Sequence, residues 1–134
     1  MLTDAGVLVA LIDSAQTQSA PCRATYKSLT LPLITTWPAF TEAMYLLHRI
    51  GGWPLQRNLW RHIEEGSLTF HVSTKSEQLR MKALMEQYRD TPMDLADSSL
   101  VVAAESLGDK RVFTIDSDFH VYRWNGREPF DVII

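Results

Sequence analysis

Apolar and polar residues alternate along the chain in a pattern that predicts short strands separated by helices. Apolar or β-branched runs of strand length occur at five places, residues 1–4, 31–36, 67–73, 111–116 and 131–134. Segments whose apolar residues recur at helical spacing, several of them bounded by caps, prolines or glycines, predict helices at 6–13, 20–29, 37–50, 54–65, 74–90 and 95–108.

The connections between these strands decide the fold class. Strands that are separated by helices need crossover connections, which produce a largely parallel sheet with helices on both faces. We therefore predict an α/β protein with three layers, α/β/α, around a central, mainly parallel sheet of four to five strands. The chain contains no repeat, low-complexity tract or linker, and its 134 residues are typical of one domain, so residues 1–134 are expected to form a single domain.

Four acidic residues lie within these apolar segments or at their ends. Asp4 and Asp116 come at the ends of predicted strands, whereas Glu42 and Asp97 lie in the early turns of apolar helices. Because sites in parallel sheets form beyond the carboxyl ends of the strands, we expect the four side chains to converge at one edge. Buried like charges repel each other, and a cation between them removes the repulsion. A site made only of carboxylates favours Mg²⁺ or Mn²⁺ over zinc.

Simpler explanations exist for two of these acids. Asp4 could cap the helix that follows it, and Glu42 could form an ion pair with Arg49. Both explanations remain open, but the segments around the two acids are otherwise apolar, almost all round in the helix that carries Glu42, as expected for a buried helix. We therefore assign both residues to the site.

Each of the other two acids has an acidic neighbour. Asp94 is well placed to cap the helix at 95–108, whereas Asp97 lies in register with Leu100 and should face the core. Asp116 directly follows its strand and is assigned to the site, and Asp118 is assigned to the turn.

Composition and charge restrict the class of protein. The net charge of −3 is unusual for a nucleic-acid-binding surface, although internal, metal-bound acids would leave the surface closer to neutral. The lone Cys22 excludes an intrachain disulfide framework, and no Cys/His spacing suits zinc. No signal-peptide pattern or membrane-spanning run occurs, so we expect a cytoplasmic protein without a membrane partner. Arg57 and Arg61 share one predicted helix and could either contact an RNA backbone or form a solvated face.

The acidic segments resemble those of the PIN-domain family, and within it the VapC-like ribonuclease toxins of type II toxin–antitoxin systems. The resemblance spans the chain: Asp4 before an apolar helix, Thr-Glu-Ala-Met-Tyr-Leu-Leu at 41–47, Met-Asp-Leu-Ala-Asp-Ser-Ser-Leu at 93–100, and Phe-Thr-Ile-Asp-Ser-Asp-Phe at 113–119. The last two segments and their spacing are the most specific.

The resemblance implies a function and a set of site residues. It places Asp4, Glu42, Asp97 and Asp116 in the acidic quartet of the family and Thr114 at its nearby hydroxyl position. It also implies a PIN-like fold, a Mg²⁺- or Mn²⁺-dependent endoribonuclease activity, a homodimer, and inhibition by a small antitoxin protein. The chemistry agrees, because carboxylate-held Mg²⁺ activates water and neutralises charge during phosphodiester hydrolysis without a protein nucleophile. Glu42 or Asp116 could orient or deprotonate that water.

Two other classes of protein also fit part of the pattern. In a receiver-like signalling domain, clustered acids bind Mg²⁺ and one aspartate accepts a phosphoryl group. Such a site needs a lysine near a strand end, and Lys110 lies at the wrong end of its strand. A catalytically silent binding subunit with a PIN fold would use the same acids only for structure.

Overall fold

The computed structural model describes residues 1–134 and contains six α-helices. They are α1 (Ala5–Ile12), α2 (Ser19–Ser28), α3 (Trp37–Gly51), α4 (Trp53–Glu64), α5 (Lys75–Gln87) and α6 (Leu95–Leu107). The strands of the main sheet are β1 (Leu2–Thr3), β2 (Leu33–Thr35), β3 (Leu68–Phe70), β4 (Arg111–Phe113) and β7 (Asp131–Ile133). No helix combines the length and the apolar character that crossing a membrane requires.

The five strands form one parallel sheet in the order β3-β2-β1-β4-β7. All the predicted strands and helices are present, so the predicted α/β class and parallel sheet are confirmed. The 3₁₀ helix η1 (Ser117–His120) and the hairpin of β5 (Arg123–Trp124) and β6 (Glu128–Pro129) were not predicted. The hairpin turn contains Asn125 and Gly126, both with positive φ, which is the Asn-Gly pattern typical of a tight hairpin.

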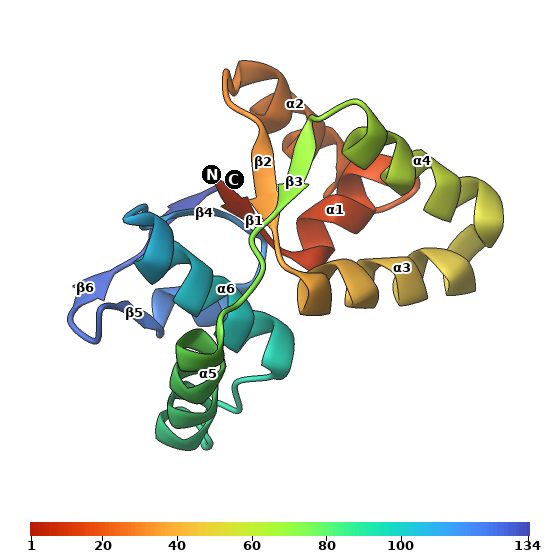
Figure 1. Ribbon diagram of the computed structural model, residues 1–134. Coiled ribbons are helices and arrows are strands. Elements are labelled where there is room, and N and C mark those ends of the chain that lie inside the picture. The colour runs from red at the N-terminus through yellow and green to blue at the C-terminus, as the bar shows by residue number, and fades with distance from the viewer.

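Helices cover both faces of the sheet (Figure 1), and alternation of side chains along the short strands divides the core into two layers. Leu2, Ile34 and Val112 face the layer of α5 and α6, together with Val132 of β7. Their neighbours Leu33, Leu68 and Phe113 face the layer of α1, α2, α3 and α4. Because side chains on a strand alternate between faces, this pairing of registers produces the three-layer α/β/α arrangement that was predicted.

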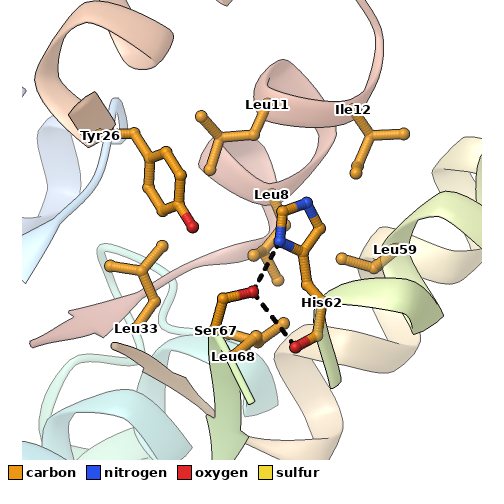
Figure 2. Close-up of a pocket in the computed structure, with 9 residues that line it drawn as sticks. All are labelled: Leu8, Leu11, Ile12, Tyr26, Leu33, Leu59, His62, Ser67 and Leu68. Atoms are coloured by element: carbon orange, nitrogen blue, oxygen red, sulfur yellow. Dashed lines mark hydrogen bonds between the residues drawn. The ribbon is translucent and has the colours of Figure 1, made fainter. Parts of the chain in front are cut away.

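The layer of α1 to α4 is almost entirely apolar. This layer contains a cavity of about 10 Å³. Leucine and isoleucine side chains form most of its lining, together with Tyr26 (Figure 2). The side-chain hydrogen bonds between the lining residues join His62 and Ser67: His62 Nδ1 lies 2.8 Å from Ser67 Oγ, and Ser67 Oγ donates to the His62 carbonyl. A void of this size is at most large enough for one water molecule, so we regard it as a packing defect rather than a ligand site.

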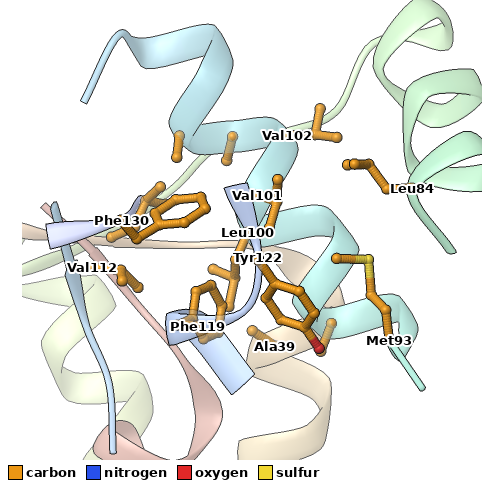
Figure 3. Close-up of a cluster of buried hydrophobic side chains, with 14 of the residues drawn as sticks. Ala39, Leu84, Met93, Leu100, Val101, Val102, Val112, Phe119, Tyr122 and Phe130 are labelled. Carbon is orange, nitrogen blue, oxygen red and sulfur yellow. The ribbon is translucent and has the colours of Figure 1, made fainter. Parts of the chain in front are cut away.

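The layer of α5 and α6 contains a cluster of aromatic side chains (Figure 3). Phe119 packs edge-to-face against Tyr122 at 5.3 Å and against Phe130 at 5.7 Å between ring centroids. These residues follow β4 in the sequence and cover α6, whose residues 96–104 are all buried. The segment after β4 is therefore fixed against α6, which is the helix that carries Asp97.

Candidate functional site

Register between β1 and β4 brings the first pair of site residues together. Thr3 pairs with Phe113, so the next residues, Asp4 and Thr114, lie side by side at the carboxyl end of the sheet. Thr114 Oγ1 donates a hydrogen bond to Asp4 Oδ2. The other oxygen of Asp4 accepts from the backbone N–H of Val7 at 3.2 Å and caps α1. Asp4 thus serves as a helix cap and as a residue of the sheet edge at once.

The start of α6 supplies the second pair. Asp94 Oδ1 accepts from the Asp97 backbone N–H at 2.7 Å, which confirms Asp94 as the N-cap of α6. Asp97 lies in the first turn and retains only 9% of its accessible surface. Its Oδ2 accepts a hydrogen bond of 2.8 Å from the buried hydroxyl of Tyr122.

The loop after β4 supplies the third pair. The Asp116 backbone N–H donates to Thr114 Oγ1 at 2.9 Å, and Asp116 Oδ1 in turn accepts from the Asp118 N–H at 2.9 Å. Asp116 therefore makes the turn bond that the sequence had suggested for Asp118. One carboxylate oxygen from each of Asp97, Asp116 and Asp118 lies within 4.8 Å of the others, so Asp118 belongs to the cluster as well as to the turn.

Carboxylates from each of these three pairs line an open cleft of about 200 Å³. All four acids that were assigned to the site line it, together with the capping residue Asp94. The full lining consists of Asp4, Ala5, Gly6, Glu42, Leu46, Asp94, Ala96, Asp97, Leu100, Ile115 and Asp116. The expected convergence of acids from distant segments is therefore present in the structure.

Glu42 reaches the cleft in a different way from the one predicted. The expectation of a helix buried all round is wrong, because α3 buries one face, with Ala39, Phe40 and Ala43, while Glu42 and Tyr45 on other faces are exposed. Phe40 and Ala43 follow the helical spacing of the buried stripe, which leaves Glu42 beside it at the rim of the cleft.

The alternative of an ion pair between Glu42 and Arg49 is absent from the structure. Arg49 instead lies over the ring of Tyr45, with its guanidinium carbon 5.8 Å from the ring centroid. Glu42 therefore has no basic partner at the rim of the cleft.

Burial and mutual repulsion shift the protonation of these acids. Loss of solvent raises the pKa of Asp4 to about 6, although the hydrogen bonds from Thr114 and Val7 oppose the shift. Loss of solvent likewise raises the pKa of Asp97 to about 7, against the hydrogen bond from Tyr122. The pKa of Glu42 is also raised, by partial burial and then by nearby carboxylates. Ionisation of these cleft acids is therefore less favourable than that of free carboxyl groups.

None of the cleft acids has a cationic partner in the protein. The chain forms five ion pairs, and all of them join other residues. The acids without a partner are Asp4, Glu42, Asp94, Asp97, Asp116 and Asp118. Since every donor atom is a carboxylate oxygen, the set suits a hard divalent cation such as Mg²⁺ or Mn²⁺ and lacks the nitrogen or sulfur ligands that zinc sites use.

The basic residues singled out in the sequence lie elsewhere. Arg57 and Arg61 are exposed on α4, and neither lines the cleft. Lys110 immediately precedes β4 and contacts Glu128 at 3.4 Å, at the opposite end of the strand from Thr114. The lysine that a receiver-like site requires is therefore missing from the cleft.

Tyr122, which contacts Asp97, was not predicted from the sequence as a residue of the site. Its position, six residues after Asp116, carries no local signal, because its contact with Asp97 depends on how the loop after β4 folds back over α6. The acidic residues could be found because charge in an apolar segment is conspicuous, and a tyrosine there is not.

Comparisons with known proteins show the fold. No protein-family model matches the chain, and no curated protein matches it. Among solved structures, VapC20 of Mycobacterium tuberculosis, described as a sarcin-ricin loop cleaving toxin, superposes with a TM-score of 0.85 at 13% identity, covering 96% of this chain and 98% of that chain. A chain of a toxin–antitoxin complex from Klebsiella pneumoniae superposes with a TM-score of 0.69 at 13% identity, covering 99% of this chain and 95% of that chain. The chain therefore has the fold of a VapC-type toxin, as its resemblance to the PIN-domain family predicted.

Proposed function

We propose that the protein is a Mg²⁺- or Mn²⁺-dependent endoribonuclease that hydrolyses RNA phosphodiester bonds and acts as the toxin of a toxin–antitoxin pair. One observation carries this proposal: five carboxylates from four distant segments line one cleft, a sixth, that of Asp118, lies beside Asp97 and Asp116, and none of the six has a cationic partner in the chain. Such an arrangement is costly in a folded protein unless a cation joins it. The shared fold with VapC20 supports the same conclusion.

Asp97, Asp116 and Asp118 would hold the cation, with Asp4 beside them. Bound divalent metal supplies an activated water and stabilises the charge that develops on the phosphate and the leaving oxygen. The donor set fits this group, because Mg²⁺ is held in proteins by a few carboxylates and by the substrate phosphate.

The other residues of the cleft have roles that follow from their positions. Thr114 fixes Asp4 by a direct hydrogen bond and receives one from the Asp116 backbone, so it holds the ends of β1 and β4 in register. Glu42 lies at the rim, where its raised pKa makes it a stronger base than a free glutamate. Glu42 or Asp116 is the group that would orient or deprotonate the attacking water.

The proposal includes partners that follow from the same fold. RNA phosphates meet an acidic cleft only when cations neutralise it, so substrate binding and metal binding are expected to depend on each other. Arg57 and Arg61 on the exposed side of α4 remain the candidates for contacts with the RNA backbone. We also propose a cognate antitoxin protein, a homodimer and a cytoplasmic location, as for the toxins that the chain resembles.

Substitution of single carboxylates tests the proposal. Asp4→Asn and Asp97→Asn should each abolish Mg²⁺-dependent cleavage of RNA, measured on labelled transcripts with and without EDTA, while circular dichroism shows an intact fold. Asp109→Asn is the matched control, because Asp109 lies at the other end of the sheet and pairs with Arg111 at 2.9 Å. Cleavage retained by both cleft variants, or cleavage insensitive to EDTA, would refute the assignment.

A further inference from the structure

We propose that Tyr122 is a positioning residue for Asp97, which selects the orientation in which this carboxylate meets a divalent cation. The inference rests on the proposed function for the cation itself, but the contact between the two side chains stands in the structure without it. The Tyr122 hydroxyl donates to Asp97 Oδ2 at 2.8 Å across 25 residues of sequence.

The ring of Tyr122 is held rigidly. The side chain is fully buried, and it packs edge-to-face against Phe119 at 5.3 Å and against Tyr88 at 5.2 Å between ring centroids. Figure 3 shows it within the aromatic cluster beneath α6, close to Leu100 and Met93. Because the ring cannot turn without displacing its neighbours, the direction of the hydroxyl is fixed by packing.

The loop that carries Tyr122 is fixed to the same helix as Asp97. Trp124 Nε1 donates to the Ala104 carbonyl at 3.1 Å, and the Asn125 N–H donates to Glu105 Oε2 at 2.8 Å. Both acceptors belong to α6, so the β5–β6 hairpin and the helix form one unit. These two hydrogen bonds attach the segment that follows Tyr122 to the helix that carries Asp97.

Packing alone does not explain the hydroxyl. A phenylalanine would fill the same space, and a buried hydroxyl is costly unless it finds a partner. Asp97 is the only hydrogen-bond partner of the Tyr122 side chain. Burial, the hydrogen bond to Asp97 and the nearby carboxylates raise the pKa of Tyr122 well above its ordinary value, so the side chain is a neutral donor at neutral pH.

The hydrogen bond engages one of the two oxygens of Asp97. Tyr122 donates to Oδ2, and Oδ1 accepts no hydrogen bond from the protein, while one Asp97 oxygen lies within 4.8 Å of one oxygen each from Asp116 and Asp118. A donor to an ionised carboxylate favours the charged form, which is the form that binds a cation. Partners of this kind, beyond the metal ligands themselves, change metal affinity or activity by about 10–100-fold when they are removed.

The experiment compares Tyr122→Phe with Tyr88→Phe in the full chain. Tyr88 is the matched control: it belongs to the same aromatic cluster and its hydroxyl also takes part in a hydrogen bond, but with the Arg123 backbone N–H at 3.1 Å rather than with a carboxylate. Thermal unfolding first establishes that both variants fold. Calorimetric titration with Mn²⁺ then measures affinity, and NMR three-bond couplings measure the Asp97 side-chain rotamer in the metal-free protein.

We expect Tyr122→Phe to weaken Mn²⁺ binding by about 10–100-fold, and Tyr88→Phe to leave it within about twofold of the wild type. Asp97 should occupy one rotamer in the wild type and in Tyr88→Phe, and several in Tyr122→Phe. Wild-type affinity together with a single Asp97 rotamer in Tyr122→Phe would overturn the inference, as would equal weakening in both variants. A wild-type chain that binds no Mn²⁺ would instead refute the proposed function, and the rotamer measurement would still decide the role of Tyr122.

Discussion

The acidic residues near the two ends of strand β4 differ in whether they have basic partners. At its start, Arg111 pairs with Asp109 at 2.9 Å and Lys110 lies 3.4 Å from Glu128. Beyond its other end lie Thr114 and Asp116, among carboxylates that have no basic partner. Both ends belong to the same strand and the same sheet, so the sheet itself does not account for the difference. Basic side chains pair with the acids at the start of β4, and none lines the cleft beyond its other end.

Introducing a lysine side chain into the cleft should have the largest effect on Mn²⁺ binding. Ile115 lines the cleft and is 38% exposed, so Ile115→Lys would bring an ammonium group among the acids. We expect Mn²⁺ affinity to fall by about 100-fold or more, since a fixed positive charge near the acids repels the metal by several kcal/mol at an effective dielectric constant near 20. Calorimetric titration measures this. Val121→Lys, on the same loop but outside the cleft lining, should bind Mn²⁺ normally, and equal loss in both variants would contradict the interpretation.

A pH series should reveal the cost of ionising the buried acids in the metal-free protein. The pKa values of Asp4 and Asp97, about 6 and about 7 in the folded chain, exceed the ordinary aspartate value, so the folded state binds more protons than the unfolded state between about pH 4 and 7. The free energy of unfolding should therefore fall as pH rises through this window, by an amount on the order of a few kcal/mol.

Urea unfolding in EDTA at pH 5, 6, 7 and 8 measures that slope. Asp97→Asn should flatten it, because one of the two groups no longer titrates, and Mn²⁺ should restore stability above pH 7 in the wild type alone. A metal-free protein whose stability rises steadily from pH 5 to pH 8 would show that burial does not raise the pKa values of Asp4 and Asp97.

The role of Asp118 offers a finer distinction. Its carboxylate lies in the cluster with Asp97 and Asp116 but outside the lining of the cleft, and it is only half-buried. We expect Asp118→Asn to weaken Mn²⁺ binding by about tenfold, or about 1.4 kcal/mol, since a charge contact near solvent is worth about 1 kcal/mol. Asp90→Asn, an exposed aspartate outside both the cluster and the cleft lining, is the control. No change in the Asp118 variant would assign that residue to the turn alone.

The smallest effect should come from the paired end of the strand. Arg111→Ala removes the exposed contact with Asp109, and exposed ion pairs contribute about 0–1 kcal/mol to stability. Mn²⁺ affinity should remain that of the wild type. A large change in Mn²⁺ binding would mean that the two ends of β4 are coupled, which would weaken the contrast between them.

The sequence was sufficient for the fold because periodicity and helix boundaries are local. Thr36, Thr74 and Asp94 each cap the helix that they precede, and Pro38 lies in the first turn of α3. Asp4 and Asp97 were identified because a carboxylate in an apolar segment conflicts with burial. In each of these positions, the neighbouring residues contain the information.

The remainder of the site depends on contacts between distant segments. The contact of Tyr122 with Asp97 arises from tertiary folding of the loop after β4, and the exposed position of Glu42 depends on which face of α3 packs against α1 and α6. The hairpin could have been found from Asn125-Gly126, but its strands are only two residues long and lack an alternating pattern. Spacing along the chain does not encode these relations.

The hydrogen bond between Thr114 and Asp4 joins residues that are 110 positions apart in the chain. Parallel pairing of β1 with β4 closes a loop of that length, and non-local contacts of this kind form slowly because the entropy of closure is lost before the contact compensates for it. The acidic cleft depends on this closure, so the growing polypeptide cannot assemble it before β4 and Asp116 have been synthesised.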